Sequence, residues 1–363
     1  MSQDHPGLVL EVRHLVKHFP IRPSFLDALR RQPPGQIRAV DDVSFTLARG
    51  EVMALVGESG CGKTTIARTL IGLEQQTSGQ ILFSGELVGA LQRRARAGLL
   101  SVDPGRVGTR EQQMLPHMSL KRLRQRAQMI FQDPYESLNP RATVFDIVAE
   151  PLLVHGVARG REHRLKRVVT ALEDAGLRPA RDFFLRFPHE LSGGQRQRVV
   201  IAGAMVLNPA LLVADEPVSS LDASVRGEIL KLMLELVRDV GVTILVVTHD
   251  LGLAWNIADR IAVMYLGRIV EEGPAEELLS NPRHPYTRAL LSVVPEVEEM
   301  EQQILQGEAP DPTRIPPGCR FHPRCPLVAS GEAARLGIEE RCRTEDLVLR
   351  DVAAEHGAAC HAL

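Results

Sequence analysis

The sequence predicts an α/β fold with a mostly parallel sheet, and three observations carry this prediction. Short apolar runs at residues 52–56, 211–214 and 243–247 have the length and composition of strands buried on both faces. Stretches with helical periodicity separate these runs, so the strands are expected to run in one direction through crossover helices. The chain has 363 residues, of which 44% are hydrophobic, enough to build the cores of about two domains.

The other expected elements complete this α/β pattern in chain order. Alternating apolar residues predict strands at 9–15 and 43–47, with a Pro- and Arg-rich segment at 20–38 between them. The run 52–56 ends in Gly57, which begins a turn into the first predicted helix. Helices are expected at 64–72, 147–177, 194–207 and 225–240.

Charge and hydropathy exclude several classes of protein. The chain has 43 Lys and Arg against 45 Asp and Glu, a net charge of −2, which argues against a basic surface that coats nucleic acid. The N-terminus lacks a basic segment followed by an apolar stretch, and no run approaches the ~18 apolar residues of a membrane span. We therefore expect a cytoplasmic protein whose membrane contact comes through a partner.

The turn after the run 52–56 has the sequence GESGCGKT, at residues 57–64. Its glycines allow a tight backbone turn that points N–H groups at phosphate, where side chains would block the approach. The lysine supplies charge to the β- and γ-phosphates, and the threonine hydroxyl suits Mg²⁺, a hard ion. The candidate ATP-binding residues of this loop are Gly57, Glu58, Ser59, Gly60, Cys61, Gly62, Lys63, Thr64 and Thr65.

Two carboxylates, Asp215 and Glu216, follow the run 211–214. The strand delivers both at its C-terminal end, where ligands bind in open α/β sheets. Asp215 is expected to orient Mg²⁺ directly or through water. Glu216 is the candidate that polarises the attacking water, a role worth ~10²- to 10⁴-fold in rate.

The sequence LSGGQ at 191–195 distinguishes this chain from kinases, GTPases and helicases, which also carry glycine loops. Together with the loop and the carboxylates, it resembles the signature of the ATP-binding-cassette (ABC) family, in which two cassettes clamp ATP between the glycine loop of one and the signature of the other. A helix N-terminus here would offer unpaired N–H groups and partial positive charge to the γ-phosphate of the other subunit's ATP. Ser192 is also a candidate N-cap. The signature candidates are Ser192, Gly193, Gly194 and Gln195.

The same resemblance implies roles for four more residues. His249, in VVTHD, matches the switch histidine that holds the γ-phosphate and the water, and Gln132, in MIFQDP, matches the glutamine that touches Mg²⁺. Asp222 belongs to the loop that crosses to the partner cassette, and Phe19 is the aromatic that stacks on adenine. The implied Mg²⁺ ligands are Thr64, Gln132 and Asp215.

Five segments resemble the oligopeptide/dipeptide branch of bacterial ABC importers: DDVSF, QDPYESLNPR, PVSSLDASV, ADRIAVMYLGRIVEEG and NPRHPYTRALLSVVP. With the core motifs, the resemblance covers most of residues 8–296. It implies an antiparallel β subdomain, a helical signature subdomain, and ATP-driven import of oligopeptides, dipeptides or a related small solute. The implied partners are two membrane permease subunits, a second ABC ATPase subunit (a paralogue or a second copy) and an extracytoplasmic solute-binding protein, with the chain on the cytoplasmic face of the membrane.

The alternative function is a soluble ABC ATPase of DNA repair or translation. Such proteins usually have two cassettes in one chain or long coiled coils, and this sequence has one set of cassette motifs and no heptad array. A nucleic-acid partner is therefore not expected.

The resemblance divides the chain into a cassette at 1–280 and a C-terminal extension at 281–363, with the helical subdomain at about 133–207. An insertion at about 86–127 is longer than the branch leads us to expect, and it carries nine Lys and Arg against two acids between Arg93 and Arg126. A solvated surface segment is the simpler interpretation. The alternative is a contact with anionic lipid headgroups or a partner.

The extension holds four of the five cysteines, at Cys319, Cys325, Cys342 and Cys360. In a cytoplasmic chain such a cluster favours a metal site over disulfides. The gaps of five, sixteen and seventeen residues lack compact CxxC pairs, so isolated free thiols are the alternative. For a bound metal, a [4Fe–4S] cluster is the first choice and zinc the second.

Overall fold

The computed structural model describes residues 7–21, 35–88, 116–294, 303, 305 and 307–363. Within them, the main sheet has the strand order β12-β13-β11-β10-β3-β9-β8-β7. Neighbouring strands from β10 to β7 pair in parallel, as the sequence predicted, and the edge from β10 to β12 is antiparallel. The strands are β3 (Val52–Val56), β7 (Ala127–Ile130), β8 (Leu211–Asp215), β9 (Thr243–Thr248), β10 (Arg260–Tyr265), β11 (Arg268–Pro274), β12 (Arg350–Ala353) and β13 (His356–Ala358).

The central strands are buried on both faces because successive side chains enter different cores. Leu212 and Ala214 of β8 pack with the helices on one face, whereas Leu211 and Val213 pack on the other face with the second sheet. This double burial explains why the strands appear in the sequence as continuous apolar runs rather than as alternating patterns.

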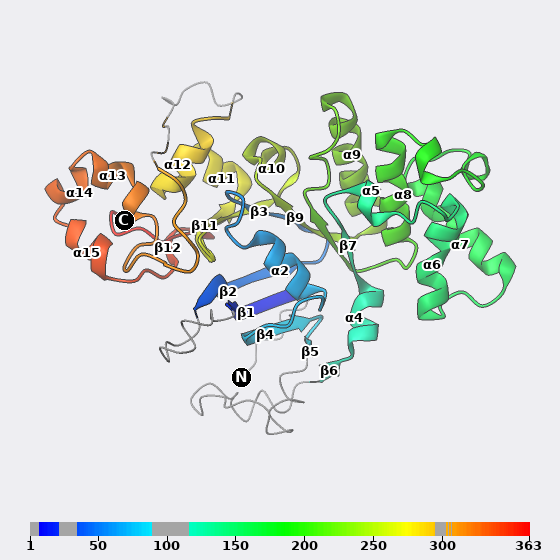
Figure 1. Ribbon diagram of the computed structural model, residues 1–363, viewed down its shortest axis with the longest axis horizontal. Coiled ribbons are helices and arrows are strands. Elements are labelled where there is room, and N and C mark those ends of the chain that lie inside the picture. The colour runs from blue at the N-terminus through cyan, green and yellow to red at the C-terminus, as the bar shows by residue number, and fades with distance from the viewer. Residues whose placement is uncertain (1–6, 22–34, 89–115, 295–302, 304, 306) are drawn as a thin grey trace.

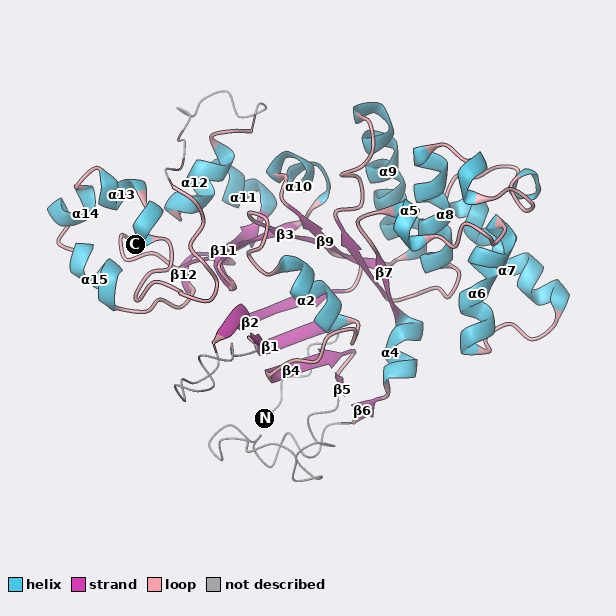
Figure 2. Ribbon diagram, in the orientation of Figure 1, coloured by secondary structure: helices cyan, strands magenta, loops and turns pink. Residues whose placement is uncertain are grey.

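The second sheet has the order β2-β1-β4-β5-β6 and is antiparallel except for the β5–β6 pair. Helix α2 (Lys63–Leu70) packs between the two sheets through Ile66 and Leu70 (Figure 2). The antiparallel β subdomain is thus confirmed. Its strands are β1 (Leu8–Pro20), β2 (Gln36–Ala48), β4 (Ser78–Phe83), β5 (Glu86–Val88) and β6 (His117–Met118).

Most of the basic insertion, at 89–115, lies outside the described residues, as does most of the Pro- and Arg-rich segment at 20–38. The described end of the insertion forms α4 (Leu120–Arg126). Arg122 pairs with Glu86 at 2.8 Å, and Arg124 donates a hydrogen bond to the carbonyl of Gly72 at 2.7 Å. At this end of the insertion, therefore, two basic side chains form contacts within the protein.

A helical region covers one face of the main sheet and lies to the right in Figure 1. The region 147–177 is helical, as expected, but it is interrupted: α6 ends where Gly156 adopts φ +69°, and α7 starts only after Gly160, so the chain forms two helices. The helix expected at 225–240 is present, and its last residues, Leu236–Val240, form a π turn. The elements are α5 (Pro134–Ser137), α6 (Val144–His155), α7 (Arg161–Asp174), two 3₁₀ turns (Ala180–Asp182 and Pro188–Glu190), α8 (Gly193–Met205) and α9 (Ala223–Glu235).

The C-terminal region, at the left of Figure 1, packs on the antiparallel edge of the main sheet. Strand β13 pairs with β11, and the fully buried His356 imidazole lies 2.8 Å from the fully buried carboxylate of Glu271. The extension therefore shares the sheet of the cassette. Its elements and the preceding helices are α10 (Leu251–Ile257), α11 (Ala275–Ser280), α12 (Pro285–Leu291), a 3₁₀ turn (His322–Arg324), α13 (Pro326–Ala329), α14 (Glu332–Arg335) and α15 (Glu339–Thr344).

In the described ranges, no helix has both the length and the apolar character needed to cross a bilayer.

Candidate functional site

The glycine loop fills the turn between β3 and α2. Gly62 has φ +113°, and a side chain there would collide with the carbonyl oxygen of Ala39. Gly60 has φ +80°, a conformation that other residues adopt only with strain. The loop therefore needs glycine for its own backbone path as well as for the approach of a phosphate.

Lys63 is buried at the first turn of α2, with 5% of its surface exposed. Its Nζ donates hydrogen bonds to the carbonyls of Gly57 at 2.6 Å and Glu58 at 2.9 Å. The ammonium group therefore lies inside the curve of the loop, with a positive charge that a phosphate would neutralise.

Thr64 and Asp215 come together from α2 and β8. The Thr64 hydroxyl donates a hydrogen bond to Asp215 Oδ1 at 3.1 Å. Burial raises the pKa of Asp215 above its ordinary 3.8; the Thr64 hydrogen bond opposes this shift, and the charge of Glu216 adds to it. A hydroxyl and a carboxylate at the end of a buried strand are donors that fit Mg²⁺.

The Glu216 side chain contacts residues from two other motifs that are distant in sequence. Its carboxylate lies 2.8 Å from His249 Nδ1 and accepts a hydrogen bond from Gln132 Nε2 at 3.1 Å. Its backbone has φ +48°, which is rare outside glycine, and its N–H donates to the carbonyl of Val247 at 2.8 Å. Such strain concentrates at functional sites. Glu216 and His249 also line a surface pocket with Ser219 and Thr248.

The signature segment forms the N-terminus of α8. The Ser192 hydroxyl accepts a hydrogen bond from the Gln195 N–H at 3.2 Å, and the Gln195 side chain accepts one from the Ser192 N–H at 3.1 Å. Ser192 is thus the N-cap in a capping box. In Figure 1, α8 lies at the right and α2 at the centre, so the signature and the glycine loop belong to separate parts of the fold.

The remaining two candidates, Asp222 and Phe19, lie at the N-cap of α9 and on β1. Asp222 is exposed and caps α9 by accepting the Val225 N–H at 3.0 Å, and this hydrogen bond lowers its pKa. Phe19 is half-buried near the end of β1, and Lys17 Nζ lies 4.4 Å from its ring centroid.

The four tail cysteines line one small pocket, although they are widely separated in sequence. The Cys319 N–H donates to the Cys342 carbonyl at 2.9 Å, and all four thiols are free. Burial, with a contribution from the neighbouring thiols, raises the pKa of Cys319 to about 12. A metal-binding arrangement of three or more His, Cys, Asp or Glu is not present among the residues that the structure describes.

Histidines that the sequence analysis missed also line this pocket: His284, His322 and His361. His284 is buried, and burial lowers its pKa to about 3, so it is neutral at pH 7. His322 Nδ1 lies 2.9 Å from the Cys319 carbonyl oxygen. In the sequence, the feature that could have identified two of these histidines is their place in the NPRHPY segment (His284) and the GCRFHPRC segment (His322).

Two tail residues that touch the glycine loop were also missed. The Tyr286 hydroxyl accepts a hydrogen bond from the Glu58 N–H at 3.0 Å, and the Arg324 guanidinium pairs with the Glu58 carboxylate at 2.8 Å. Both residues lie in segments quoted above, Tyr286 in NPRHPY and Arg324 in GCRFHPRC, but neither segment indicates a partner that is 228 or 266 residues away.

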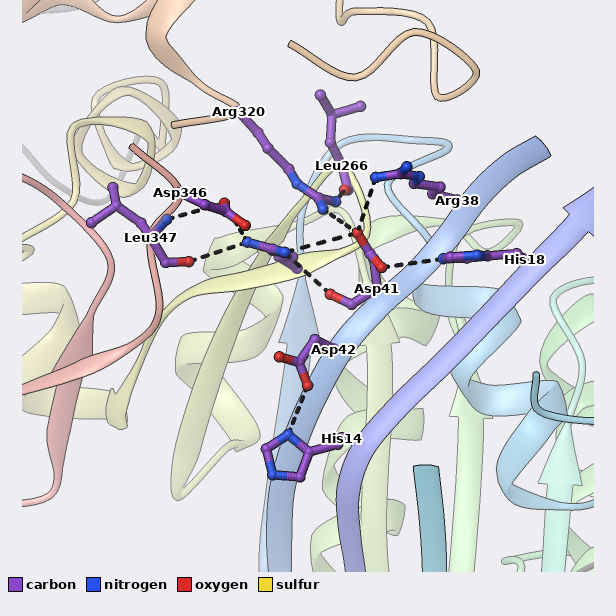
Figure 3. A network of polar contacts seen from close by, with 10 residues as sticks. His14, His18, Arg38, Asp41, Asp42, Leu266, Arg320, Asp346 and Leu347 are labelled. Atoms are coloured by element: carbon purple, nitrogen blue, oxygen red, sulfur yellow. Dashed lines mark hydrogen bonds and ion pairs between the residues drawn. The ribbon is translucent and has the colours of Figure 1, made fainter. Parts of the chain in front are cut away.

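A second ionic contact joins the tail to β2. Asp41 lies at the centre of a network in which Arg320 and Arg38 point toward its carboxylate, and His18 Nε2 lies 3.2 Å from it (Figure 3). Arg268 pairs with Asp346 at 2.6 Å and lies 3.9 Å from Asp41. Burial tends to raise the pKa of Asp41, but Arg320, His18 and Arg268 together hold it below 3.8.

Two family models match this chain. One, described as ABC transporter, matches residues 40–219, and the other, described as oligopeptide/dipeptide transporter, C-terminal region, matches residues 270–331. The oligopeptide transport ATP-binding protein AppF of Bacillus subtilis is 41% identical, over 99% of each chain. The di/tripeptide transport ATP-binding protein DppF of Pseudomonas aeruginosa is 39% identical, over 97% of each.

Solved structures of ATP-binding cassettes have the same fold. The chain is similar to cbiO1 of Clostridium perfringens, part of an ABC transporter complex, with a TM-score of 0.56, 27% identity, and coverage of 76% of this chain and 92% of that one. A dimeric cassette with bound ADP and phosphate gives a TM-score of 0.55 at 26% identity, covering 73% of this chain and 98% of that one.

Proposed function

This chain belongs to the ABC transporter family, and we propose that it is the ATP-hydrolysing subunit of an importer for oligopeptides, dipeptides or a related small solute. The observation that carries the proposal is the full-length likeness, at 41% identity, to an oligopeptide transport ATP-binding protein, with the cassette and the peptide-transporter tail in one chain. The DNA repair or translation alternative gains no support, because the relatives compared are named for peptide transport.

The proposed site residues act on ATP in two groups. Lys63 and the loop N–H groups bind the phosphates, and Phe19 stacks on adenine. Thr64, Asp215 and Gln132 would hold Mg²⁺, which supplies positive charge to the phosphate oxygens when bound. The likeness to cassettes whose structure holds ADP and phosphate supports hydrolysis at this loop.

Glu216 is the proposed group that polarises the attacking water. His249 and Gln132 contact its two carboxylate oxygens, at 2.8 and 3.1 Å, and fix its orientation. Because the catalytic water must lie in line with the γ-phosphate, a fixed carboxylate is more effective than a mobile one. His249 is further proposed to hold the γ-phosphate.

A second cassette completes the ATP site in this proposal. Helix α8, which begins at the signature, lies apart from α2, which begins at the glycine loop, so the signature is proposed to meet ATP on a partner cassette. Ser192, Gly193, Gly194 and Gln195 provide this surface, and Asp222 lies in the loop that crosses to the partner. Hydrolysis then replaces one bridging phosphate chain with two separating anions, which opens the dimer.

The remaining partners follow from the transport role. Two permease subunits carry the solute, and an extracytoplasmic binding protein delivers it, with this chain peripheral on the cytoplasmic face of the membrane. We also propose that the chain divides into a cassette at 1–280 and a C-terminal extension at 281–363, with the helical subdomain of the cassette at about 133–207.

The four tail cysteines are proposed to hold an iron–sulfur cluster, with zinc as the second choice. All four line one pocket, which supports the proposal, and because they do not form a metal-binding arrangement in this structure, binding would have to draw the thiols closer together. The bound group would cross-link three segments of the tail. Because the Cys319 thiol has a raised pKa, binding must release protons, so affinity should rise with pH.

A transport assay tests the function. In a strain that lacks this chain, the parent should restore energy-dependent uptake of labelled di- to hexapeptides, and Glu216→Gln should not. Membranes that contain the tagged parent should yield two permeases and a second cassette on mild solubilisation. Equal uptake with and without the chain, or purification with nucleic acid in place of permeases, would remove the importer proposal.

A further inference from the structure

The tail segment 319–325 lies directly against the glycine loop. Arg324 meets Glu58 in a two-pronged ion pair, with Nη1–Oε2 at 2.8 Å and Nη2–Oε1 at 3.1 Å. The Arg324 side chain is only 9% exposed and that of Glu58 is 29% exposed. A forked pair with little solvent fixes the direction of both side chains, and solvent screens it less than an exposed pair.

Glu58 is held through all three of its polar groups. Its carboxylate pairs with Arg324, and its N–H donates to the Tyr286 hydroxyl at 3.0 Å. Its carbonyl accepts from Lys63 Nζ at 2.9 Å. Burial raises the pKa of Tyr286, so the hydroxyl keeps its proton. A displacement of Glu58 therefore reaches the phosphate-binding lysine through a single hydrogen bond.

Buried contacts anchor the tail segment that carries Arg324 to the cassette. Phe321 is buried against Tyr265 and Tyr286, with ring centroids 5.2 and 5.3 Å away. On the other side of Phe321, Arg320 pairs with Asp41 and donates to the Leu266 carbonyl (Figure 3). The segment thus reaches the nucleotide domain at two points, four residues apart.

We infer that Arg324 is a positioning residue for ATP binding: together with Tyr286 it fixes Glu58, and through Glu58 it holds the glycine loop and Lys63 in the conformation that accepts phosphates. Arg324 should also increase ATP affinity through its charge. The Arg324 charge balances a carboxylate that would otherwise repel the triphosphate. The inference rests on ATP binding at this loop, and it does not depend on which solute is imported.

Equilibrium binding of a fluorescent ATP analogue to the full-length chain tests the inference. Arg324→Gln should weaken binding about ten-fold, within the range measured for coupled neighbours. Arg324→Lys should recover part of the loss, because it restores the charge but not the fork. In steady-state hydrolysis, KM for ATP should rise by a similar factor while kcat at saturating ATP stays within about two-fold.

The partner variant keeps the test valid if Arg324→Gln folds poorly. Glu58→Gln removes the same pair from its more exposed side. It should weaken binding less than Arg324→Gln does, because it also removes the carboxylate that repels the triphosphate. The double variant should bind no more weakly than Arg324→Gln alone. Arg343→Gln is the matched control, since Arg343 pairs with Glu339 within α15 at 2.8 Å and should leave affinity unchanged. Binding within two-fold of the parent in a folded Arg324→Gln protein, independent effects in the double variant, or a fall in kcat without a change in KM would each overturn the inference. Loss of peptide uptake would not affect this result, so the two proposals fail separately.

Discussion

Two clusters of polar groups each surround one glutamate. One is the carboxylate end of the main sheet, around Glu216, and the other is the tail contact on the glycine loop, around Glu58. The chain assembles them differently. Gln132, Glu216 and His249 each follow a strand, and these strands, β7, β8 and β9, are parallel neighbours. Their C-terminal ends must meet at one edge, so sequence order and fold together bring the three side chains close.

The contact around Glu58 has no such rule behind it. Arg324 is 266 residues away, and it reaches the loop because the tail packs on the antiparallel edge of the sheet. The difference shows that regular strand topology can place the groups proposed for the chemistry, whereas the groups proposed to hold the loop depend on irregular long-range packing.

The largest effect is expected at the carboxylate end. Glu216→Gln should reduce ATP turnover by about 100-fold or more and leave ATP affinity intact, because it removes the charge that polarises water but few ground-state contacts. ATP should then trap a stable dimer, visible by size-exclusion chromatography. Glu235→Gln, on the exposed end of α9, serves as the control. Turnover at even half the parental rate would exclude Glu216 as the general base.

Lys63→Ala should instead affect binding. The variant removes a charge-assisted contact with phosphate, so affinity for ATP should fall by about 1.5–3 kcal/mol, or about ten- to hundred-fold. Calorimetry with Mg-ATP measures it, and Lys166→Ala, at a 74% exposed side chain, is the control. An unchanged dissociation constant would remove Lys63 from the site.

Cys319→Ser tests whether the tail can lose its metal and its folded structure while the cassette still binds ATP. We expect loss of bound metal and protease sensitivity after about residue 311, because the cluster would no longer close the long loops of the tail. ATP should still bind, but more weakly, by no more than the loss in Arg324→Gln. Elemental analysis and absorbance of anaerobically purified parent give the reference. Four freely titrating thiols and no metal in the folded parent would leave the cysteines as isolated thiols.

The smallest effect concerns Asp41. Its pKa in the folded chain lies below 3.8, so its ion pairs should stabilise the fold fully above that ordinary value and lose their effect as the pH falls through the lower folded value. At pH 7, Asp41→Asn should cost about 1–3 kcal/mol, because Arg320 loses its buried partner. Urea unfolding between pH 3 and 7 measures this, and the difference between variant and parent should shrink at the acid end.

Asp42→Asn is the neighbouring control for that series. Asp42 is 48% exposed and pairs with an 82% exposed His14, so its substitution should have little effect. A cost for Asp42→Asn equal to that for Asp41→Asn would show that the network around Asp41 has no special role.

The sequence predicted the sheet, the glycine loop and the carboxylates because each depends on local order or strand direction. It did not predict the break at Gly156, since the apolar pattern continues across both helices and only the left-handed glycine ends the first one. It identified the four cysteines but neither their histidine neighbours nor the Glu58–Arg324 pair, because nothing in a sequence states which of many arginines meets which carboxylate.

The late position of the tail has a consequence for synthesis on the ribosome. The glycine loop emerges long before Arg324, which follows Glu58 by 266 residues. At roughly 5–20 residues per second, this interval lasts roughly 10 to 50 seconds. During that time the nascent cassette has its lysine and its loop but not the arginine that orients them. If Arg324 has the role proposed above, full affinity for ATP arrives only when translation is nearly finished, and an incomplete chain should bind nucleotide more weakly than the finished protein.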